Sequence, residues 1–141
     1  KNLDSGKIVF QIQGNYKIIH YILYVFSNLF LITSVLQFNV AEFIGFKQLI
    51  DYFKKSKNSD NRKLNNNFLY RYIRHPMYLG IILVYIFSHT VFTQLFFINL
   101  ACIILYIEIG SYFEEKTLLR KFGKKYHIYK ASTFKYLPFI R

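Results

Sequence analysis

The sequence has little of what a disulfide-linked or metal-binding protein needs. Its 141 residues contain one cysteine, Cys102, which lies inside an apolar stretch. A single cysteine excludes an intramolecular disulfide framework and a cysteine-based metal site, and we expect no metal centre. Nothing near Lys1 has the basic, apolar, small-residue order of a signal peptide. Because the first residue is also not methionine, we expect the sequence to be part of a longer protein.

Acidic residues are scarce as well. The chain has 7 Asp and Glu against 19 Lys and Arg, a net charge of +12. In a soluble protein this charge would indicate a nucleic-acid partner. Here the basic residues flank apolar segments, and 53% of all residues are hydrophobic and 21% aromatic. These proportions are typical of membrane proteins, so we expect an all-α integral membrane protein without a nucleic-acid partner.

Three apolar segments are candidates for crossing the bilayer. Ile18 to Leu36 is a run of 19 uncharged residues, which as a helix would cover about 28 Å, close to the hydrocarbon thickness. Two further runs, Met77–Phe92 and Leu95–Phe113, are separated only by Thr93-Gln94. This spacing predicts two antiparallel helices joined by a tight turn. We therefore expect about three transmembrane helices, two of which form a hairpin over residues 77–113.

The remaining segments are polar or amphipathic. Residues 1–17 show no strong period and are interpreted as an irregular lead-in. Residues 40–53 have apolar positions at helical spacing, which predicts an interfacial amphipathic helix, and residues 54–67 indicate a solvated loop. In the basic tail, Phe122-Gly123 has the form of a helix end with glycine as its cap. The chain thus divides into an N-terminal part, 1–67, and a C-terminal part, 68–141.

The distribution of basic residues predicts the orientation. Lys and Arg number three in residues 1–17, eight in 37–76, none in the 93–94 turn and eight in 114–141. The positive-inside rule then places the 37–76 loop and the C-terminal tail in the cytoplasm. Their junction is therefore expected at the cytoplasmic face of a multi-pass protein.

The ten residues Arg71–Gly80 contain two arginines, a histidine, a proline and a glycine. An antiparallel hairpin pairs residues equally distant from its turn, so Arg74 should lie level with Phe113, next to Glu114 and Glu115, within about one helical turn or 5 Å. Pro76 suits the first position of a helix, whose start favours an anion. Gly80, one turn later, allows close approach of a ligand or a helix.

This junction has two interpretations. With backbone donors on one side and carboxylates on the other, it could hold a zwitterion that carries an additional positive centre. Alternatively, Arg71 and Arg74 are membrane anchors, the glutamates pair with nearby cations, and Gly80 serves helix packing alone. Glu108 is a separate candidate, because a carboxylate within an apolar helix is functional by default. It could equally be protonated, or paired with a Lys or Arg from a helix that this sequence does not contain.

Polar residues also interrupt the first apolar segment. His20, Asn28 and Thr33 are expected to hydrogen-bond to neighbouring helices or to lie near an interface.

The C-terminal part resembles a known family. Arg-His-Pro-Met-Tyr-Leu-Gly at 74–80, Glu-Glu at 114–115, Phe122-Gly123 with Tyr126 and Tyr129, and Leu-Pro-Phe-Ile at 137–140 are similar to the catalytic half of the isoprenylcysteine carboxyl methyltransferase and phospholipid methyltransferase superfamily. Upstream, residues 42–48 and 68–72 resemble the bacterial branch that includes methanethiol S-methyltransferase and NnrU-like proteins. The match covers residues 70–140, half of the chain.

The resemblance implies an integral-membrane methyltransferase that uses S-adenosylmethionine at the cytoplasmic face, with a folded-back tail as its cap. The residues implied to bind the cofactor are Tyr70, His75, Pro76, Met77, Tyr78, Gly80, Glu114, Tyr126 and Tyr129. Arg74 is implied to hold an anionic acceptor, and Glu115 to share cofactor binding or to orient Arg74. If the acceptor is a thiol, His75 or Glu115 is the candidate base. A lipid-facing entrance favours a small or amphipathic thiol, a carboxylate or a lipid-borne acceptor.

The sequence also departs from the family. Isoprenylcysteine enzymes carry a substrate-contacting arginine four residues before the first glutamate, and Gly110 stands there in this chain. Residues 62–68 have no clear counterpart of those enzymes' upstream cofactor segment. The alternatives are an NADPH-dependent reductase of the sterol reductase type, or a non-catalytic basic membrane protein that binds anionic lipid or a partner subunit.

Overall fold

The computed structural model describes residues 6–37 and 68–136. Along the chain these residues form β1 (Ile8–Gln11), α1 (Tyr16–Gln37), the short 3-10 helix η1 (Phe68–Arg71), α4 (Pro76–Phe87), β2 (Val91–Thr93), α5 (Gln94–Phe122) and α6 (Lys124–Ser132). The expected interfacial helix at 40–53 and the polar loop at 54–67 lie outside the described residues.

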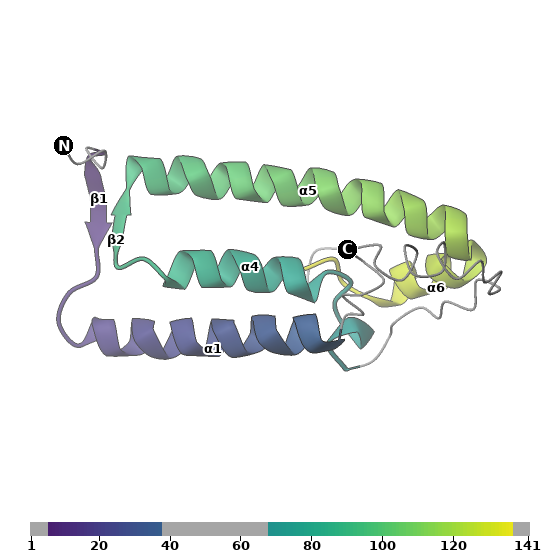
Figure 1. The fold of residues 1–141 in the computed structure, drawn as a ribbon, viewed down its shortest axis with the longest axis horizontal. Helices are drawn as coiled ribbons and strands as arrows, with labels where there is room; N and C mark the ends of the chain where they lie inside the picture. Colours follow the sequence, from purple (N-terminus) through teal and green to yellow (C-terminus); the bar gives the residue numbers. More distant parts are fainter. Residues whose placement is uncertain (1–5, 38–67, 137–141) are drawn as a thin grey trace, which may run out of the picture.

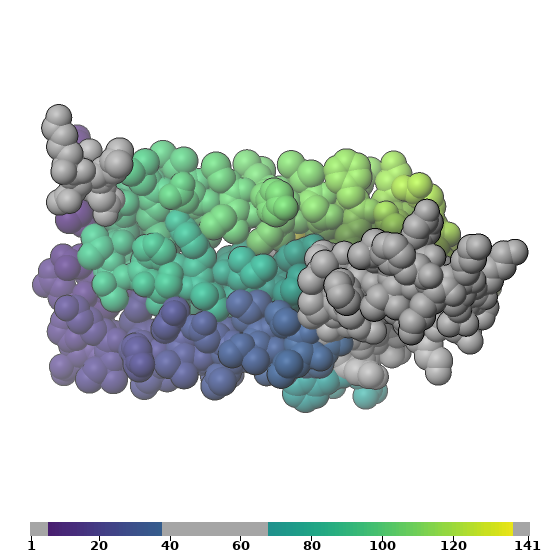
Figure 2. Space-filling model, viewed as in Figure 1, coloured from purple at the N-terminus to yellow at the C-terminus, as the bar shows by residue number. Residues whose placement is uncertain are grey.

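Three helices lie side by side, with α4 between α1 and α5 (Figure 1). In the space-filling view their side chains form one continuous surface (Figure 2). α1 and α5 are long and apolar enough to cross a membrane, and α4 is a shorter apolar helix of 12 residues, Pro76–Phe87. At about 18 Å, α4 alone is shorter than the hydrocarbon core. The structure therefore has two helices of spanning length within its described residues, in a mostly helical fold that agrees with a membrane protein.

Close packing of α1 on α4 depends on small residues. Ser27 and Ser34 of α1 are buried at 3% and 0% exposure. A Cβ added to Gly80 would lie 3.1 Å from both Cα and Cβ of Leu31, so glycine allows the two helix backbones to approach. Gly80 thus serves helix packing in this structure, and its contact with a cofactor stays a prediction.

Polar side chains within α1 are satisfied locally. Asn28 Nδ2 donates to the carbonyl of Tyr24 at 2.8 Å, and Thr33 Oγ1 donates to the carbonyl of Leu29 at 2.7 Å. Of the two expectations for Asn28 and Thr33, hydrogen bonds to neighbouring helices are not what the described residues show, because a carbonyl four residues back in the same helix is within reach. A position near an interface stays a prediction. His20 has no such bond, and its Nε2 is buried without a partner among the described residues.

The connection between α4 and α5 differs from the expected tight turn at 93–94. α4 ends at Phe87, and β2 pairs antiparallel with β1. Thr93 then caps α5, its hydroxyl accepting a hydrogen bond from the Phe96 N–H at 3.2 Å. The irregular lead-in expected over 1–17 is therefore wrong for Ile8–Gln11. Ile8–Gln11 is too short and alternates too little between apolar and polar residues to indicate a strand, and its partner β2 lies far away in the sequence.

α5 continues without a break past the two glutamates to Phe122, where Gly123 adopts φ +51°. The predicted helix end and its glycine cap are confirmed. Beyond it, α6 folds back toward the start of α4 (Figure 1).

Candidate functional site

The start of α4 is held in place by the backbone of the tail. The Phe134 N–H donates to the Tyr72 carbonyl at 2.9 Å, and the Arg74 N–H donates to the Phe134 carbonyl at 2.8 Å. The His75 N–H donates in turn to the Lys135 carbonyl at 3.2 Å. Pro76 then opens α4 as its first residue, as predicted, and needs no hydrogen bond from its own nitrogen. Two segments about sixty residues apart in sequence therefore form one short extended pair.

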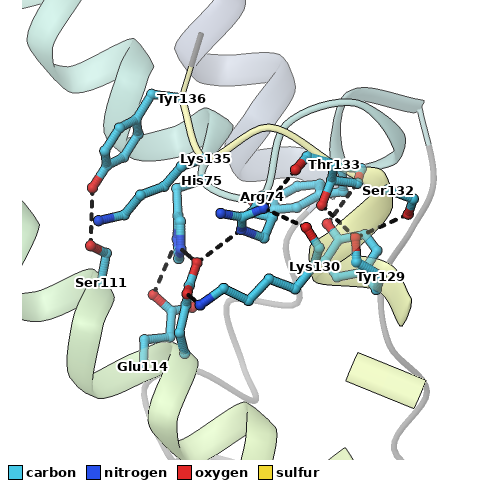
Figure 3. A network of polar contacts seen from close by, with 12 residues as sticks. Arg74, His75, Ser111, Glu114, Tyr129, Lys130, Ser132, Thr133, Lys135 and Tyr136 are labelled. Carbon is cyan, nitrogen blue, oxygen red and sulfur yellow. Dashed lines mark hydrogen bonds and ion pairs between the residues drawn. The ribbon is translucent and has the colours of Figure 1, made fainter. Parts of the chain in front are cut away.

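Arg74 and Glu115 form a buried ion pair at this junction (Figure 3). Arg74 Nε donates to Glu115 Oε1 at 2.9 Å, and the two side chains are 2% and 9% exposed. The other carboxylate oxygen accepts from Lys130 Nζ at 2.6 Å, and His75 Nε2 lies 3.3 Å from Oε1. Three nitrogen groups around one carboxyl hold it in its ionised form. The sequence-based pairing of the Arg74 loop with the glutamates is confirmed.

Arg74 also closes the end of α6. Its Nη1 donates to the carbonyls of Lys130 at 2.9 Å and Thr133 at 2.6 Å. The last carbonyls of a helix have no intrahelical partner, and a cation near them is favourable. Arg74 therefore joins α4, α5 and α6 at one point, and its guanidinium is engaged by protein groups.

Glu114 faces a different environment from Glu115. Its Oε2 accepts a hydrogen bond from Tyr78 Oη at 3.1 Å and lies 3.6 Å from His75 Nδ1. The Glu114 side chain is 27% exposed, and no cation of Lys or Arg pairs with it among the described residues. His75 lies between the two glutamates, 5% exposed and stacked on Tyr78 with ring centroids 5.4 Å apart. Within residues 6–37 and 68–136, the Glu114 carboxylate is therefore partly exposed and is not neutralised by Lys or Arg.

Aromatic residues of the tail complete this junction. Tyr129 Oη donates to the Tyr70 carbonyl at 2.6 Å, and Tyr70 Oη donates to the Ser34 carbonyl at 3.4 Å. Burial raises the pKa of Tyr129 to about 12, so its hydroxyl stays a donor at neutral pH. Tyr126 is 1% exposed, and its hydroxyl has no hydrogen-bond partner among the described residues.

A second pair of contacts anchors the tail to α5. Lys135 Nζ pairs with the Glu108 carboxylate, and Tyr136 Oη donates to Ser111 Oγ at 3.0 Å. Glu108 is paired, as one of the interpretations expected, but with a lysine of the tail and not with a cation from another helix. A functional role for Glu108 stays a prediction. The Lys135 side chain is 18% exposed and that of Glu108 is 46% exposed, so the pair lies at the edge of the junction.

The structure brings together the predicted residues except Met77 and Gly80. Tyr70, Arg74, His75, Pro76, Tyr78, Glu114, Glu115, Tyr126 and Tyr129 all lie at this junction. Met77 follows Pro76 in the first turn of α4 and is partly exposed, whereas Gly80 faces α1. Sequence reasoning missed Lys130, Thr133 and Ser111. A lysine, a threonine and a serine carry no signal by themselves, and only the folded-back path of the tail gives them partners.

Comparisons with known proteins show which family the sequence belongs to. The profile of the phospholipid methyltransferase family matches residues 21–125. A methanethiol S-methyltransferase of Pseudomonas deceptionensis is 33% identical over 106 residues, which cover 71% of this chain and 37% of that protein. One of Crocosphaera subtropica is 28% identical over 124 residues, 88% of this chain and 48% of that protein.

A third relative, methanethiol S-methyltransferase 1 of Bradyrhizobium diazoefficiens, is 29% identical over 109 residues, 77% of this chain and 38% of that protein. The chain thus spans less than half the length of the curated relatives it matches. No solved structure matches the chain. The profile match covers well over half of the sequence and includes the Arg74–Gly80 segment, both glutamates and Gly123, and the chain belongs to the phospholipid methyltransferase family.

Proposed function

We propose that the chain carries the methyl-transfer site of an integral-membrane methyltransferase, with S-adenosylmethionine as donor and a small thiol as acceptor. The observation that carries the proposal is the contrast between the two adjacent glutamates. Glu115 is buried and neutralised by Arg74 and Lys130, whereas Glu114 is 27% exposed and accepts from the Tyr78 hydroxyl. The buried Glu115 cluster therefore holds α5 in place, and Glu114 is the carboxylate that can contact a ligand.

The residues present fit the donor. S-Adenosylmethionine supplies an activated methyl group and carries an amino group, a carboxylate and a sulfonium. Glu114 would hold a cationic group, and the first turn of α4, whose backbone donors lack intrahelical acceptors, would favour the carboxylate. The buried Tyr126 hydroxyl, which has no partner in the part of the chain that the structure describes, offers one more hydrogen bond. The ring contacts of His75 and Tyr78 provide an aromatic wall.

The charges at the junction favour a thiol over a carboxylate acceptor. Arg74 is paired with Glu115 and two carbonyls, Lys130 with Glu115, and Lys135 with Glu108. The proposal that Arg74 holds an acceptor anion is therefore replaced by a positioning role for Arg74 and Glu115. Gly110 supplies no substrate arginine, and the named relatives are methanethiol S-methyltransferases.

A thiol acceptor must lose its proton as the new bond forms. The acceptor sulfur would form its bond to the methyl group as the methyl–sulfur bond of the donor breaks, which leaves the donor sulfonium as a neutral thioether. The S–H bond would break as well, and its proton needs an acceptor within hydrogen-bond reach. Glu115 already interacts with Arg74, Lys130 and His75. His75, whose other ring nitrogen faces Glu114, is therefore the proposed general base. Burial of this junction under α6 excludes water from the reacting atoms.

The orientation of the protein follows the same proposal. The described basic residues from Arg71 onward lie at the end of the molecule that contains η1 and α6, whereas Lys7 and Lys17 lie at the β1–β2 end. The positive-inside rule therefore favours a cytoplasmic face for the junction in a multi-pass protein.

The test is a binding and transfer experiment on the full-length protein in membranes or detergent. Wild type should bind S-adenosylmethionine with micromolar-range affinity, a typical enzyme magnitude, and transfer labelled methyl groups to methanethiol. Prenylcysteine analogues and phosphatidylethanolamine serve as carboxylate and lipid arms.

Glu114→Gln should abolish measurable binding, and Glu108→Gln, a matched substitution on the same helix, should not. Equal binding by wild type and Glu114→Gln would refute the assignment of the site. Absence of binding by wild type, with retained affinity for acidic liposomes, would support a non-catalytic membrane protein instead.

A further inference from the structure

A hollow of about 620 Å³ lies at the end of the molecule opposite the methyl-transfer junction. Its lining residues are Phe10, Gln11, Ile12, Gln13, Tyr16, Ile19, His20, Leu23 and Phe87. They come from β1, the following loop, the first two turns of α1 and the end of α4, which share one end of the molecule (Figure 1). The volume falls in the range of sites for small ligands, roughly 300 to 1,000 Å³.

The hollow is separate from the junction around Arg74. Ser34 of α1 contacts Tyr70 at the junction, and His20 precedes Ser34 by 14 residues. At 1.5 Å per residue His20 therefore lies about 21 Å away along the helix axis. A ligand in the hollow cannot touch the methyl-transfer site.

His20 is the residue that indicates a ligand. It is 7% exposed, and its Nε2 has no hydrogen-bond partner among the described residues. Its neighbours are aromatic rings, with centroids of Phe87 at 5.6 Å and Phe92 at 6.3 Å, both in edge contact. A buried polar group without a partner is destabilising, and such groups are nearly always satisfied by something. Other atoms of His20 line the hollow while Nε2 itself is closed to solvent, so a group that enters the hollow reaches Nε2 by a rotation of the imidazole.

The chemistry of the wall defines the occupant. None of the described residues that line the hollow is Lys, Arg, Asp or Glu, and most of them are aliphatic or aromatic. The neighbouring face of α1 is apolar and exposed, with Ile18, Ile22 and Phe26 each at least 60% exposed. The occupant therefore comes from the hydrocarbon and carries an uncharged hydrogen-bonding group.

The depth of His20 matches one part of a membrane lipid. α1 begins at Tyr16, one turn before His20, which places the imidazole about 6 Å from the end of a helix about 33 Å long. A bilayer core is about 30 Å thick, with polar interfaces several ångströms deep on either side. His20 thus lies near the border of hydrocarbon and headgroup, where the ester carbonyls of glycerolipids are found.

We propose that this hollow is a second binding site, in which a glycerolipid of the leaflet opposite the methyl-transfer junction inserts an acyl chain and places an ester carbonyl on the His20 imidazole. A neutral imidazole has one N–H donor, and an ester carbonyl is an acceptor without charge. The site needs no particular headgroup, because no charged side chain lines it.

The test compares ester with ether lipids on the full-length protein. Phosphatidylcholine with two ester-linked chains and its dialkyl ether analogue are titrated onto delipidated protein, and bound lipid is counted by native mass spectrometry. Wild type should bind the ester lipid roughly fivefold more tightly than the ether lipid, the size of one net hydrogen bond. His20→Leu should bind both lipids equally.

The matched control is His89→Leu, at the same end of the molecule. His89 hydrogen-bonds to Ser88 and to the Tyr85 carbonyl, and it does not line the hollow, so its variant should keep the ester preference. Leu23→Trp, at a position 41% exposed, fills the hollow and should weaken binding of both lipids. Binding of S-adenosylmethionine should be unchanged in all three variants.

Three results would overturn the proposal. The first is an ester preference that persists in His20→Leu. The second is retention of lipid by Leu23→Trp at the wild-type level. The third is a wild-type protein that binds no lipid there because a second copy or another segment of the chain covers the hollow, which would appear as a change of oligomeric state in Leu23→Trp.

Discussion

Replacing Glu115 by glutamine should destabilise the protein more than any other single polar substitution at the junction. The carboxylate accepts from Arg74 and Lys130 and lies beside His75. Glutamine keeps the volume but removes the charge, and its amide presents N–H groups to these donors. Arg74, 5% exposed, would remain as a buried cation without its counter-ion.

The magnitude follows from the burial of each contact. Breaking a buried pair by removing one partner costs 3–5 kcal/mol as an order of magnitude. Arg74 keeps the carbonyls of Lys130 and Thr133, so we expect the lower end, about 3 kcal/mol. The Lys130 side chain is 43% exposed, and its share of the loss is small because water screens it. For a folded unit of 141 residues the change in unfolding temperature is roughly 10 °C, and it is smaller in a longer chain.

Thermal unfolding of the full-length protein in detergent, followed by far-UV circular dichroism, measures this change. Glu108→Gln is the control, since it also removes a lysine-paired carboxylate from α5, but one whose side chain is 46% exposed. Its cost should be below about 1 kcal/mol. If the two variants unfold at the same temperature, the buried pair does not fix the junction and the reasoning is wrong.

Three further substitutions test other contacts. Gly80→Ala would place a Cβ 3.1 Å from the backbone of Leu31 and should destabilise by about 1–3 kcal/mol, whereas Gly110→Ala, with nothing within 4 Å, should be neutral or slightly stabilising in the same unfolding assay. Gly123→Ala forces φ +51° on a residue with a side chain and should cost about 1 kcal/mol or more, visible as earlier loss of helix on heating. Tyr129→Phe removes a 2.6 Å hydrogen bond, about 1 kcal/mol. Since burial raises the pKa of Tyr129 to about 12, this stabilisation is present below pH 10 and disappears as the pH rises toward 12, so the variant should show a shallower alkaline decline.

Much of the junction could be predicted from the sequence because it depends on local rules. Pro76 at the first position of a helix and Gly123 after the last are terminal signals with a mechanism. The pairing of Arg74 with Glu115 followed from the antiparallel register of two apolar helices. The predicted register was close although the turn was misplaced, because Arg74 contacts Glu115, two residues from the predicted partner Phe113, while the connection runs over residues 88–93.

The remaining features depend on contacts between distant segments. β1 is stabilised by pairing with β2, about eighty residues later, and neither strand has a pattern of its own. The tail lies beside the start of α4 because backbone groups of Tyr72, Arg74 and Phe134 exchange hydrogen bonds. Backbone groups are the same in every residue, so no sequence pattern marks them.

The charges of the junction lead to one more conclusion about the adjacent glutamates. Glu115 carries one negative charge against the two positive charges of Arg74 and Lys130, so this cluster is cationic by itself. Glu114, on the same turn of α5, has a tyrosine and a histidine as neighbours and is partly exposed. A cationic ligand group is therefore attracted to Glu114 and repelled by the buried cluster beside it.

Glu114→Gln should lose cofactor binding with little change in unfolding temperature. Glu115→Gln should lower the unfolding temperature first, and its loss of binding should be partial at temperatures where the protein remains folded. Two neighbouring carboxylates with opposite outcomes would separate ligand binding from positioning within one helical turn.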